Sequence, residues 1–281
     1  MNWTGIMPVL FYNNQRGSMR TPLKWVGSKA RIMDRLAPHL TPATRLVEPF
    51  GGSAAVMVNT DYPSYLIGDV NQDLINFHLN CRDNTQELID EARKLFATEN
   101  SEASYIRLRR WFNEFRTPTV YRSALFLFLN RHCFNGLCRY NASGEFNVPY
   151  GKYHSPYFPQ EEIEYFANQA LRAEFKHQGW LATLMEVRHG DIVYIDPPYI
   201  PLTATSSFTN YAPGGFGLPE QKELAEALLD LGSYGIPIIA SNSNAVLSHE
   251  LYKQFTIHQI HAPRSIGGAS SAKELIATLN C

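Results

Sequence analysis

The sequence predicts an α/β protein with a doubly wound, mostly parallel, Rossmann-like sheet and an inserted helical and hairpin segment. Residues 192–195 form a continuous apolar run, which is typical of a strand buried on both faces of a parallel sheet. At residues 45–58 a short strand, a glycine turn and an apolar helix start follow one another, as in the first crevice of a doubly wound sheet. Between residues 101 and 173 the alternation of strands and helices breaks down, which indicates the insertion.

Length and composition limit the class of protein. The chain has 281 residues, 44% of them hydrophobic, which is enough for one large α/β domain with a sizeable core. No apolar run approaches the roughly 20 residues of a membrane span, and the four cysteines form no paired framework. Cys133 and Cys138 beside His132 match no standard zinc spacing. We therefore expect a cytoplasmic protein with no membrane association and no metal.

Basic residues are concentrated in two stretches, although the net charge is only −1. Residues 16–45 carry seven basic residues against one acidic residue, and residues 105–154 carry eight against two. Aromatic residues interleave with them, so the stretches are a candidate footprint for a phosphate backbone. Two solvated helix faces explain the charges equally well.

The N-terminal part leads to the first strand. Residues 1–19 show no periodicity and are expected to be a poorly ordered extension, with Met19 as an alternative start of translation. Residues 21–40 predict a helix that follows Gly27 and Ser28, whose backbone N–H groups are candidates for binding an anion beside Lys29.

The first strand ends in Glu48 and leads into the turn Phe50-Gly51-Gly52. This turn lacks the G-x-G-x-x-G spacing, so we expect a cofactor without a diphosphate. The second strand, residues 65–69, ends in Asp69, which is placed to accept hydrogen bonds from ribose hydroxyls. A plain helix N-cap is the alternative for this acid. The next helix is expected from residue 71 to about residue 95.

The insertion begins with two helices, predicted at residues 101–115 and 118–131, of which the second is apolar on all sides and should be buried. Residues 130–153 are long, aromatic and rich in Asn and Gly, but poor in core periodicity. Amide and guanidinium side chains on a loop or hairpin suit the reading of base edges, because Asn pairs with adenine and Arg with guanine. A decorated loop is the alternative, although loops of this length are usually functional.

The predicted reaction centre is Asp196-Pro197-Pro198-Tyr199, directly after the strand 191–195. Prolines present carbonyl oxygens without N–H donors, so Asp196 and the Pro197 carbonyl can face one small site as two acceptors. Tyr199 would supply a planar wall. Such a site suits a planar group with an exocyclic NH₂, as in adenine or cytosine. A strand that simply stops at a Pro-rich turn is the alternative.

The remaining elements follow this tetrapeptide. Residues 200–217 are expected to form a mobile lid, and residues 219–231 an amphipathic helix. The last three strands are predicted at residues 236–240, 255–260 and 275–279, with Ser241 and Asn242 at the C-terminal edge of the first.

Taken together, five segments resemble the DNA adenine methyltransferases of the Dam type, from about residue 21 to the C-terminus. The most specific part is Asn135-Gly-Leu-Cys-Arg-Tyr-Asn141 followed by Gly144-Glu-Phe-Asn-Val-Pro149, because other methyltransferases share the cofactor turn and the tetrapeptide but not this segment. The five segments are Lys24-Trp25 with Lys29, Glu48-Pro-Phe-Gly-Gly52, Gly68-Asp69 with Asn71 and Asp73, residues 130–153, and Asp196-Pro-Pro-Tyr199.

The resemblance implies a methyltransferase sheet and the transfer of a methyl group from S-adenosylmethionine to adenine N6 in GATC of double-stranded DNA. The implied catalytic residues are Asp196, Pro197, Pro198 and Tyr199. The implied cofactor-binding residues are Trp25, Lys29, Glu48, Phe50, Gly51, Gly52, Asp69 and Asp196. The implied DNA-binding residues are Lys24, which reads the first guanine, Phe134, which intercalates, and Asn135, Leu137, Arg139, Asn141, Pro149, Lys152 and Tyr153.

Three features depart from the family pattern. Lys152 stands where an arginine is expected, Pro263 replaces the first of two arginines before Ser265-Ile266, and the chain stops early. The first departure bears on contacts to flanking phosphates.

The expected chemistry is direct in-line transfer to a flipped adenine. The N6 lone pair is delocalised into the ring, so two acceptors must hold the amine where the methyl group can be attacked. When the adenine leaves the duplex it loses a few kcal/mol of stacking free energy, and packing of the base on Tyr199 would partly replace this loss. The alternatives are a cytosine N4 methyltransferase, a catalytically silent DNA-binding protein on the same fold, and a methyltransferase of protein amides or free nucleotides.

The expected division of the chain follows from these assignments. Residues 20–96 and 174–281 form the catalytic, S-adenosylmethionine-binding domain, residues 97–173 form the DNA target-recognition insertion, and residues 1–19 precede both. We expect no obligate protein partner and a location in the cytoplasm of a bacterium or of a phage-infected bacterial cell.

Overall fold

The computed structural model describes residues 18–201, 216–263 and 271–281. Residues 1–17 of the extension predicted for residues 1–19, most of the predicted lid, and Ser265-Ile266 lie outside the described residues, whereas Pro263 is the last residue of β6 (Thr256–Pro263). Met19, at the edge of the described chain, is held in place by the side chain of Asn59. Its backbone N–H donates to Asn59 Oδ1 at 2.7 Å, and its carbonyl accepts from Asn59 Nδ2 at 3.0 Å.

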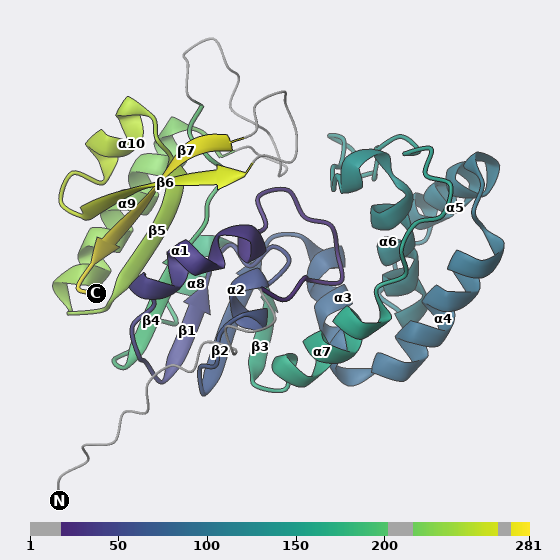
Figure 1. Ribbon diagram of the computed structural model, residues 1–281, viewed down its shortest axis with the longest axis horizontal. Coiled ribbons are helices and arrows are strands. Elements are labelled where there is room, and N and C mark those ends of the chain that lie inside the picture. The colour runs from purple at the N-terminus through teal and green to yellow at the C-terminus, as the bar shows by residue number, and fades with distance from the viewer. Residues whose placement is uncertain (1–17, 202–215, 264–270) are drawn as a thin grey trace, which may run out of the picture.

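The centre of the described structure is a seven-stranded sheet with the strand order β3-β2-β1-β4-β5-β7-β6 (Figure 1). The first five strands in sequence run parallel, whereas β7 is antiparallel to both β5 and β6. The predicted doubly wound, mostly parallel sheet is therefore confirmed. The strands are β1 (Arg45–Glu48), β2 (Ser64–Asp69), β3 (Ala173–His177), β4 (Asp191–Ile195), β5 (Ile238–Ser243), β6 (Thr256–Pro263) and β7 (Ser271–Leu279).

Side chains of the central strand alternate between two hydrophobic clusters, one on each face of the sheet. Ile192 and Tyr194 of β4 belong to one cluster, and Val193 and Ile195 to the other, as the period of two in a strand requires. The first face is covered by α1 (Met33–Leu36), α2 (Ala55–Val58), α3 (Gln72–Asp83) and α7 (Gln160–Ala170), and the short turns η1 (Lys29–Ile32) and η2 (Ala37–His39) flank α1. The second face is covered by α8 (Trp180–Leu184), α9 (Leu218–Ser233) and α10 (Val246–Leu251).

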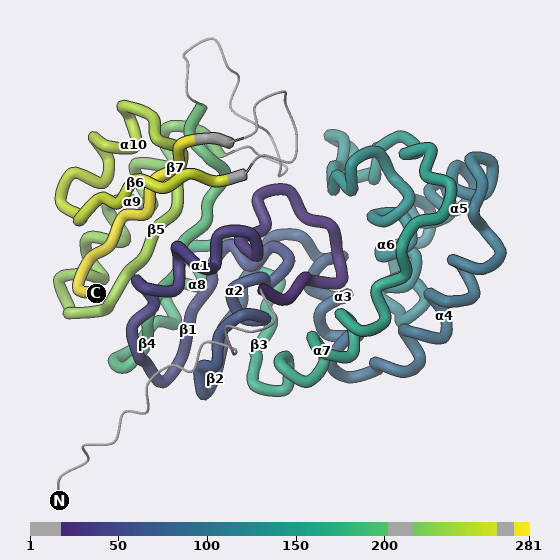
Figure 2. The backbone as a smooth tube through the Cα atoms, viewed as in Figure 1, coloured from purple at the N-terminus to yellow at the C-terminus, as the bar shows by residue number. Residues whose placement is uncertain are grey.

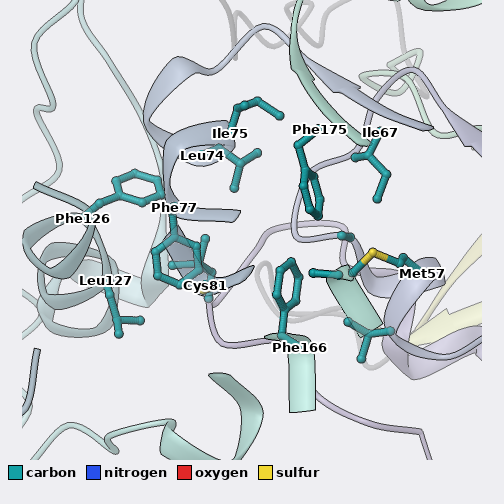
Figure 3. Close-up of a cluster of buried hydrophobic side chains, with 14 of the residues drawn as sticks. Met57, Ile67, Leu74, Ile75, Phe77, Cys81, Phe126, Leu127, Phe166 and Phe175 are labelled. Carbon is teal, nitrogen blue, oxygen red and sulfur yellow. The ribbon is translucent and has the colours of Figure 1, made fainter. Parts of the chain in front are cut away.

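Three helices form a lobe beyond α3, which we call the helical lobe: α4 (Thr85–Thr98), α5 (Glu102–Glu114) and α6 (Val120–His132) (Figure 1). Helix α6 is buried along its length from residue 122 to residue 132, as its apolar sequence predicted. Figure 3 shows how the lobe joins the sheet: Phe126 and Leu127 of α6 lie against Phe77 of α3, and the same cluster continues to Ile67 of β2. The lobe and the sheet therefore share one hydrophobic core.

The chain before η1 crosses from the sheet to this lobe (Figure 2). The buried amide of Asn130 on α6 accepts from the Lys24 N–H at 2.8 Å and donates to the Lys24 carbonyl at 2.8 Å. This side chain joins two segments that are 106 positions apart in sequence.

One prediction of secondary structure was wrong, and two elements were not predicted. The helix expected from residue 71 to about residue 95 is interrupted at Asn84, whose φ of −134° and ψ of 38° end α3 before α4 begins. Asn and Thr favour such breaks because their side chains bond to nearby backbone, and Thr85 Oγ1 donates to the Cys81 carbonyl at 2.7 Å. Strand β3 and helix α7 were not predicted. β3 is an edge strand whose burial alternates, so it lacks a continuous apolar run.

Candidate active site

Three carboxylates gather at one edge of the sheet because they end neighbouring parallel strands. Glu48 is the last residue of β1, Asp69 is the last of β2, and Asp196 directly follows β4. They line a pocket of about 630 Å³ together with the residues expected to bind the cofactor and to catalyse. Those other lining residues are Trp25, Lys29, Phe50, Gly51, Gly52, Pro197, Pro198 and Tyr199.

The turn Gly51-Gly52 has no room for side chains. A Cβ at Gly51 would clash with the Ile67 side chain of β2, and the Gly51 N–H donates to the Gly68 carbonyl at 2.9 Å. Gly52 has a φ of +48°, and a Cβ there would lie 2.8 Å from the indole nitrogen of Trp25. The turn is thus packed between β2 and Trp25, which forms part of the pocket wall.

Asp69 holds the glycine turn and the start of α3 together. Its Oδ2 accepts from the Gly52 N–H at 3.0 Å, and its Oδ1 accepts from the Asn71 N–H at 2.9 Å. The N-cap of α3 is Asn71, whose side chain accepts from the Leu74 N–H at 3.1 Å, so the reading of Asp69 as a plain N-cap is wrong. Burial raises the pKa of Asp69, and the two N–H donors oppose that rise. Each carboxylate oxygen retains capacity for a further donor.

Asp196 is paired on one side only. Its Oδ2 lies 2.5 Å from the Lys29 ammonium, and its Oδ1 is buried without a hydrogen-bond partner among the described residues. Burial raises the pKa of this carboxyl, and the Lys29 charge opposes the rise. Lys29 also donates to the Gly27 carbonyl at 2.7 Å, so its ammonium is directed toward Asp196 and the pocket, and not toward an anion at the N-terminus of η1 as the sequence suggested.

Glu48 carries a second buried oxygen without a partner. Its Oε1 has no hydrogen bond in the described structure, and its side chain lines the pocket. Burial raises the pKa of Glu48 to about 8, a backbone hydrogen bond from Met57 opposes the rise, and the nearby charge of Asp196 adds to it. The pocket therefore offers two unsatisfied carboxyl oxygens to a positively charged or amine-bearing ligand.

Tyr199 forms a wall of the pocket and is fixed by its hydroxyl. The hydroxyl donates to Glu274 Oε2 of β7 at 3.0 Å, and the ring centroid lies 5.2 Å from the Lys29 ammonium. Burial raises the pKa of Tyr199 well above its ordinary value. The structure thus places the predicted planar wall beside the predicted catalytic carboxylate.

The residues expected to bind DNA, apart from Lys24, lie in one irregular segment that follows α6, contains a hairpin and borders the pocket. Isolated bridges join Cys133 to Tyr150 and Tyr140 to Phe146, and η3 (Phe134–Gly136) opens the segment. Cys138, Tyr140 and Gly144 of this hairpin line the pocket. The expected residues that are exposed are Phe134, Asn135, Arg139, Pro149 and Lys152, whereas Lys24, Leu137, Asn141 and Tyr153 are half-buried.

Side-chain contacts divide these residues into two groups. In one group, the Lys24 ammonium lies 4.4 Å from the centroid of the Tyr153 ring, and the Tyr153 hydroxyl accepts from the Asn135 N–H at 3.1 Å. In the other, Arg139 Nε donates to Asn147 Oδ1 at 2.7 Å, and Asn141 Nδ2 donates to Glu145 Oε2 at 2.8 Å.

Sequence reasoning missed the role of Arg122. It was counted among the basic residues of a phosphate footprint, but it is buried, donates to Asp73 Oδ1 from Nε at 2.7 Å, and bonds to the carbonyls of Phe112 and Phe115. Tyr140 donates to the same Asp73 carboxylate at 2.8 Å, so the first turn of α3 connects the hairpin to α6.

Other members of the two basic stretches are also interior. Arg45 pairs with Asp191 at 2.7 Å, and Arg131 donates from Nε to the Pro22 carbonyl at 2.9 Å. Both side chains are buried. The two basic stretches therefore contain buried arginines that stabilise the fold as well as exposed ones. Arg16 lies outside the described residues.

Neither a metal centre nor a membrane span is present in the described part of the chain. Across residues 18–201, 216–263 and 271–281, no group of three or more His, Cys, Asp or Glu side chains is arranged to hold a metal ion. No helix within these ranges is both long and apolar enough to cross a membrane.

Comparison of the sequence with known proteins identifies the family of this chain. Residues 25–266 match the family described as D12 class N6 adenine-specific DNA methyltransferase. The chain is 47% identical over 264 residues to the Retron Ec67 DNA adenine methylase of Escherichia coli, covering 92% of this chain and 91% of that protein. It is 41% identical over 265 residues to a DNA adenine methylase of Serratia marcescens, covering 92% and 97%. It is 39% identical over 261 residues to a DNA adenine methylase of Escherichia coli K12, covering 92% and 94%.

Proposed function

The chain belongs to the D12 class of N6 adenine-specific DNA methyltransferases, and from this membership we propose that it methylates the adenine of GATC in duplex DNA with S-adenosylmethionine as donor. The observation that carries the proposal is the buried, unpartnered Oδ1 of Asp196, which lines the pocket beside Tyr199. The named relatives support a DNA adenine target, and the Asn135 to Pro149 segment supports the site GATC.

The residues of the pocket fit the proposed donor. S-adenosylmethionine carries a sulfonium and an ammonium, and the pocket contains the unpartnered oxygens Glu48 Oε1 and Asp196 Oδ1. A volume of about 630 Å³ falls within the usual range of small-molecule sites. In this proposal Asp69 accepts from the ribose hydroxyls, the Phe50 to Gly52 turn and Trp25 enclose the adenosine, and Glu48 faces the cationic end. When bound, the donor supplies an electrophilic methyl group.

The chain's own residues perform the positioning. Asp196 Oδ1 and the Pro197 carbonyl accept the two N6 hydrogens of adenine, which directs the nitrogen lone pair toward the methyl group. Lys29 holds Oδ2, so the carboxylate cannot rotate away from this geometry. Tyr199 covers the face of the base and excludes water. No strong base is required, because the amine becomes acidic once it carries the methyl group.

The target adenine must leave the duplex to reach Asp196, and we assign residues 97–173 to DNA recognition during this step. In this assignment Lys24 reads the first guanine, Phe134 fills the space left in the stack, and Asn135, Leu137, Arg139 and Asn141 read the remaining base edges. Pro149, Lys152 and Tyr153 complete the DNA-facing hairpin. The half-exposed Phe134 side chain, 50% accessible, supports the intercalating role.

Digestion of DNA treated with the purified protein and S-adenosylmethionine tests the proposal. One nuclease should be blocked by adenine methylation at GATC, and a second should require it. We expect protection from the first and cutting by the second. Protein that binds S-adenosylmethionine but leaves both digests unchanged would contradict the GATC assignment.

Two matched controls separate chemistry from binding and adenine from cytosine. Asp196→Ala should abolish transfer while the duplex affinity stays within about twofold, because the residue contacts the flipped base and not the phosphates. An oligonucleotide whose only possible methyl acceptor is adenine should be labelled, and one whose only acceptor is cytosine should not. Labelling of the second would favour cytosine N4 methylation, for which the same acceptor pair suffices.

A further inference from the structure

The two prolines after β4 remove the backbone donors that would normally fix the catalytic segment to the sheet. β4 and β5 pair as far as Ile195 and Ala240. Pro197 and Pro198 have no N–H with which to continue the ladder. Residues 197–200 must therefore be held next to β5 by something other than strand pairing.

Three polar side chains take the place of the missing ladder. Asn242 Oδ1 accepts from the Ile200 N–H at 3.0 Å, and Ser243 Oγ donates to the Ile200 carbonyl at 2.5 Å; both side chains belong to β5. Gln221 Nε2, on α9, donates to the Pro198 carbonyl at 2.6 Å. Asn242 Nδ2 donates to Gln221 Oε1 at 3.3 Å, which joins the two anchors.

The orientation of each amide in this network is determined by its partners. Asn242 Oδ1 accepts from two N–H groups, those of Ile200 and Ser243, so its Nδ2 must face Gln221. Gln221 then presents Oε1 to Asn242, and its Nε2 is left to face Pro198. Gln221 and Asn242 are both 0% exposed, so a reversed amide would leave buried polar groups unpaired. Only one orientation of the Asn242 and Gln221 amides satisfies all the hydrogen bonds of this network.

We propose that Gln221 and Asn242 are positioning residues for methyl transfer. They tie down Pro198 and Ile200, the residues on either side of Tyr199, and so fix the direction of the tetrapeptide that carries Asp196. Because the Pro198 carbonyl already accepts a hydrogen bond from Gln221, the Pro197 carbonyl is the one that accepts from the substrate amine. This role rests on the proposed function. Gln221 and Asn242 lie outside the pocket lining and support the tetrapeptide.

Two substitutions at Gln221 test the inference without opening a cavity. Gln221→Met keeps the side-chain length and removes the hydrogen bond to Pro198. Gln221→Glu keeps an acceptor for Asn242 Nδ2 but has no donor for the Pro198 carbonyl. Ser248→Ala is the matched control, because Ser248 Oγ on α10 is buried and has no hydrogen-bond partner among the described residues, the tetrapeptide included.

Three quantities should be measured for each variant: the single-turnover rate of methyl transfer to a duplex oligonucleotide, the Kd values for S-adenosylmethionine and duplex, and the thermal unfolding midpoint. We expect both Gln221 variants to lose roughly 10- to 100-fold in transfer rate, the size of effect that follows a misplacement of about 1 Å. Both Kd values should stay within about threefold of wild type, because the donor and duplex contacts are unchanged. Ser248→Ala should transfer at the wild-type rate.

Asn242→Asp provides an independent check on the amide orientation. It keeps the acceptor for the Ile200 N–H but replaces the donor that faces Gln221 Oε1, so Gln221 should reverse and release the Pro198 carbonyl. The transfer rate should fall as in Gln221→Met, with little change in donor affinity.

Two results for Gln221→Met would contradict the positioning role and leave the proposed function intact. One is a wild-type transfer rate. The other is an equal loss of transfer rate and of affinity for S-adenosylmethionine, while the wild-type protein still methylates DNA. A wild-type protein that methylates no DNA in the same assay would overturn the proposed function and the inference together.

Discussion

Lys29 and Asp196 are 167 positions apart in the sequence, yet the Lys29 ammonium lies 2.5 Å from Asp196 Oδ2 in the pocket. The lysine is 5% exposed, so this pairing operates largely out of water. Burial raises the pKa of Asp196, and the lysine charge limits that rise. The ionised state that the proposed reaction needs therefore depends on a residue from a distant part of the chain.

Replacing Lys29 should move the pH dependence of transfer. In Lys29→Met the pKa of Asp196 should rise further, because burial remains while the opposing charge is lost. The acid limb of the pH–rate profile should shift to higher pH, and the rate at pH 7 should fall roughly tenfold or more as the ionised fraction of Asp196 decreases. Single-turnover rates from pH 6 to pH 9.5 measure this, and Lys29→Arg should retain most of the wild-type profile. An unmoved acid limb would mean that Lys29 does not control the ionisation of Asp196.

Glu48 should link donor binding to proton release. Its pKa of about 8 leaves the carboxyl mostly protonated at pH 7, and a cationic donor favours the ionised form. Donor affinity should therefore increase as the pH rises from 6.5 to 8.5. Calorimetric titrations in two buffers of different ionisation enthalpy should show a proton released by the wild-type protein and none by Glu48→Gln. Equal heats in both buffers for the wild type would contradict this linkage.

Arg139 should contribute to the discrimination of one guanine. Its exposed guanidinium is oriented by Asn147, which accepts from Nε at 2.7 Å and from Nη2 at 3.3 Å. Arg139→Ala should reduce discrimination at one position of the site by roughly 1–3 kcal/mol. Transfer to GATC and to its single-base variants measures the effect, with Arg110→Ala on the exposed face of α5 as control. A uniform loss over all sequences would instead indicate a phosphate contact.

His78 should make the fold sensitive to acid. Its Nε2 lies 2.8 Å from the Gly52 carbonyl, its Nδ1 is buried without a partner among the described residues, and burial lowers its pKa to about 4. Between pH 6.5 and 4 the unfolded chain binds the proton that the folded chain excludes, so the free energy of unfolding falls as the pH falls. This contribution is complete above pH 6.5, and roughly 3 kcal/mol of it is lost by pH 4.

Urea unfolding at pH 7, 5.5 and 4.5 measures the effect of His78. His78→Gln keeps an amide donor near the Gly52 carbonyl but cannot titrate, so its loss of stability with acid should be smaller than that of the wild type. Identical slopes for the two proteins would assign the acid sensitivity to other groups. His132, whose pKa burial also lowers to about 4, is one such group and stays unchanged in both proteins.

Elements with a strong local signal could be predicted from the sequence. β4 was found because four apolar residues precede the two prolines, and α6 because its apolar residues surround the helix. The break at Asn84 was missed because the apolar helical period continues on both sides of it, although Asn84 and Thr85 both favour breaks. β3 was missed because an edge strand with one exposed face has a short, mixed pattern. In these cases the position in the sheet, which the local sequence does not contain, determines the structure.

The same limit applies to the site. The residues at strand ends were predicted because parallel strands place their carboxyl ends together, and the pocket contains all the residues expected to bind the cofactor. Pairings between distant segments were not predicted. Arg122 was counted with the basic residues of a possible phosphate footprint, because nothing near it in sequence indicates its pairing with Asp73, 49 positions away. Gln221 gave no signal at all, since its only distinctive feature is the carbonyl that it contacts in the folded chain.

The packing of Phe77 on α3 against Phe126 on α6 limits how sequence specificity can evolve in this protein. The helical lobe is not a detachable module, because removing it would expose the outer side of α3 and open the core that also supports β2. Transplanting the whole lobe between relatives should therefore cost stability unless α3 is exchanged with it. The hairpin at residues 134–149, to which we assign the reading of base edges, carries exposed side chains and is a smaller unit of exchange. Recombination that changes the target site should have its crossovers on either side of this hairpin, with the helices beneath it left intact.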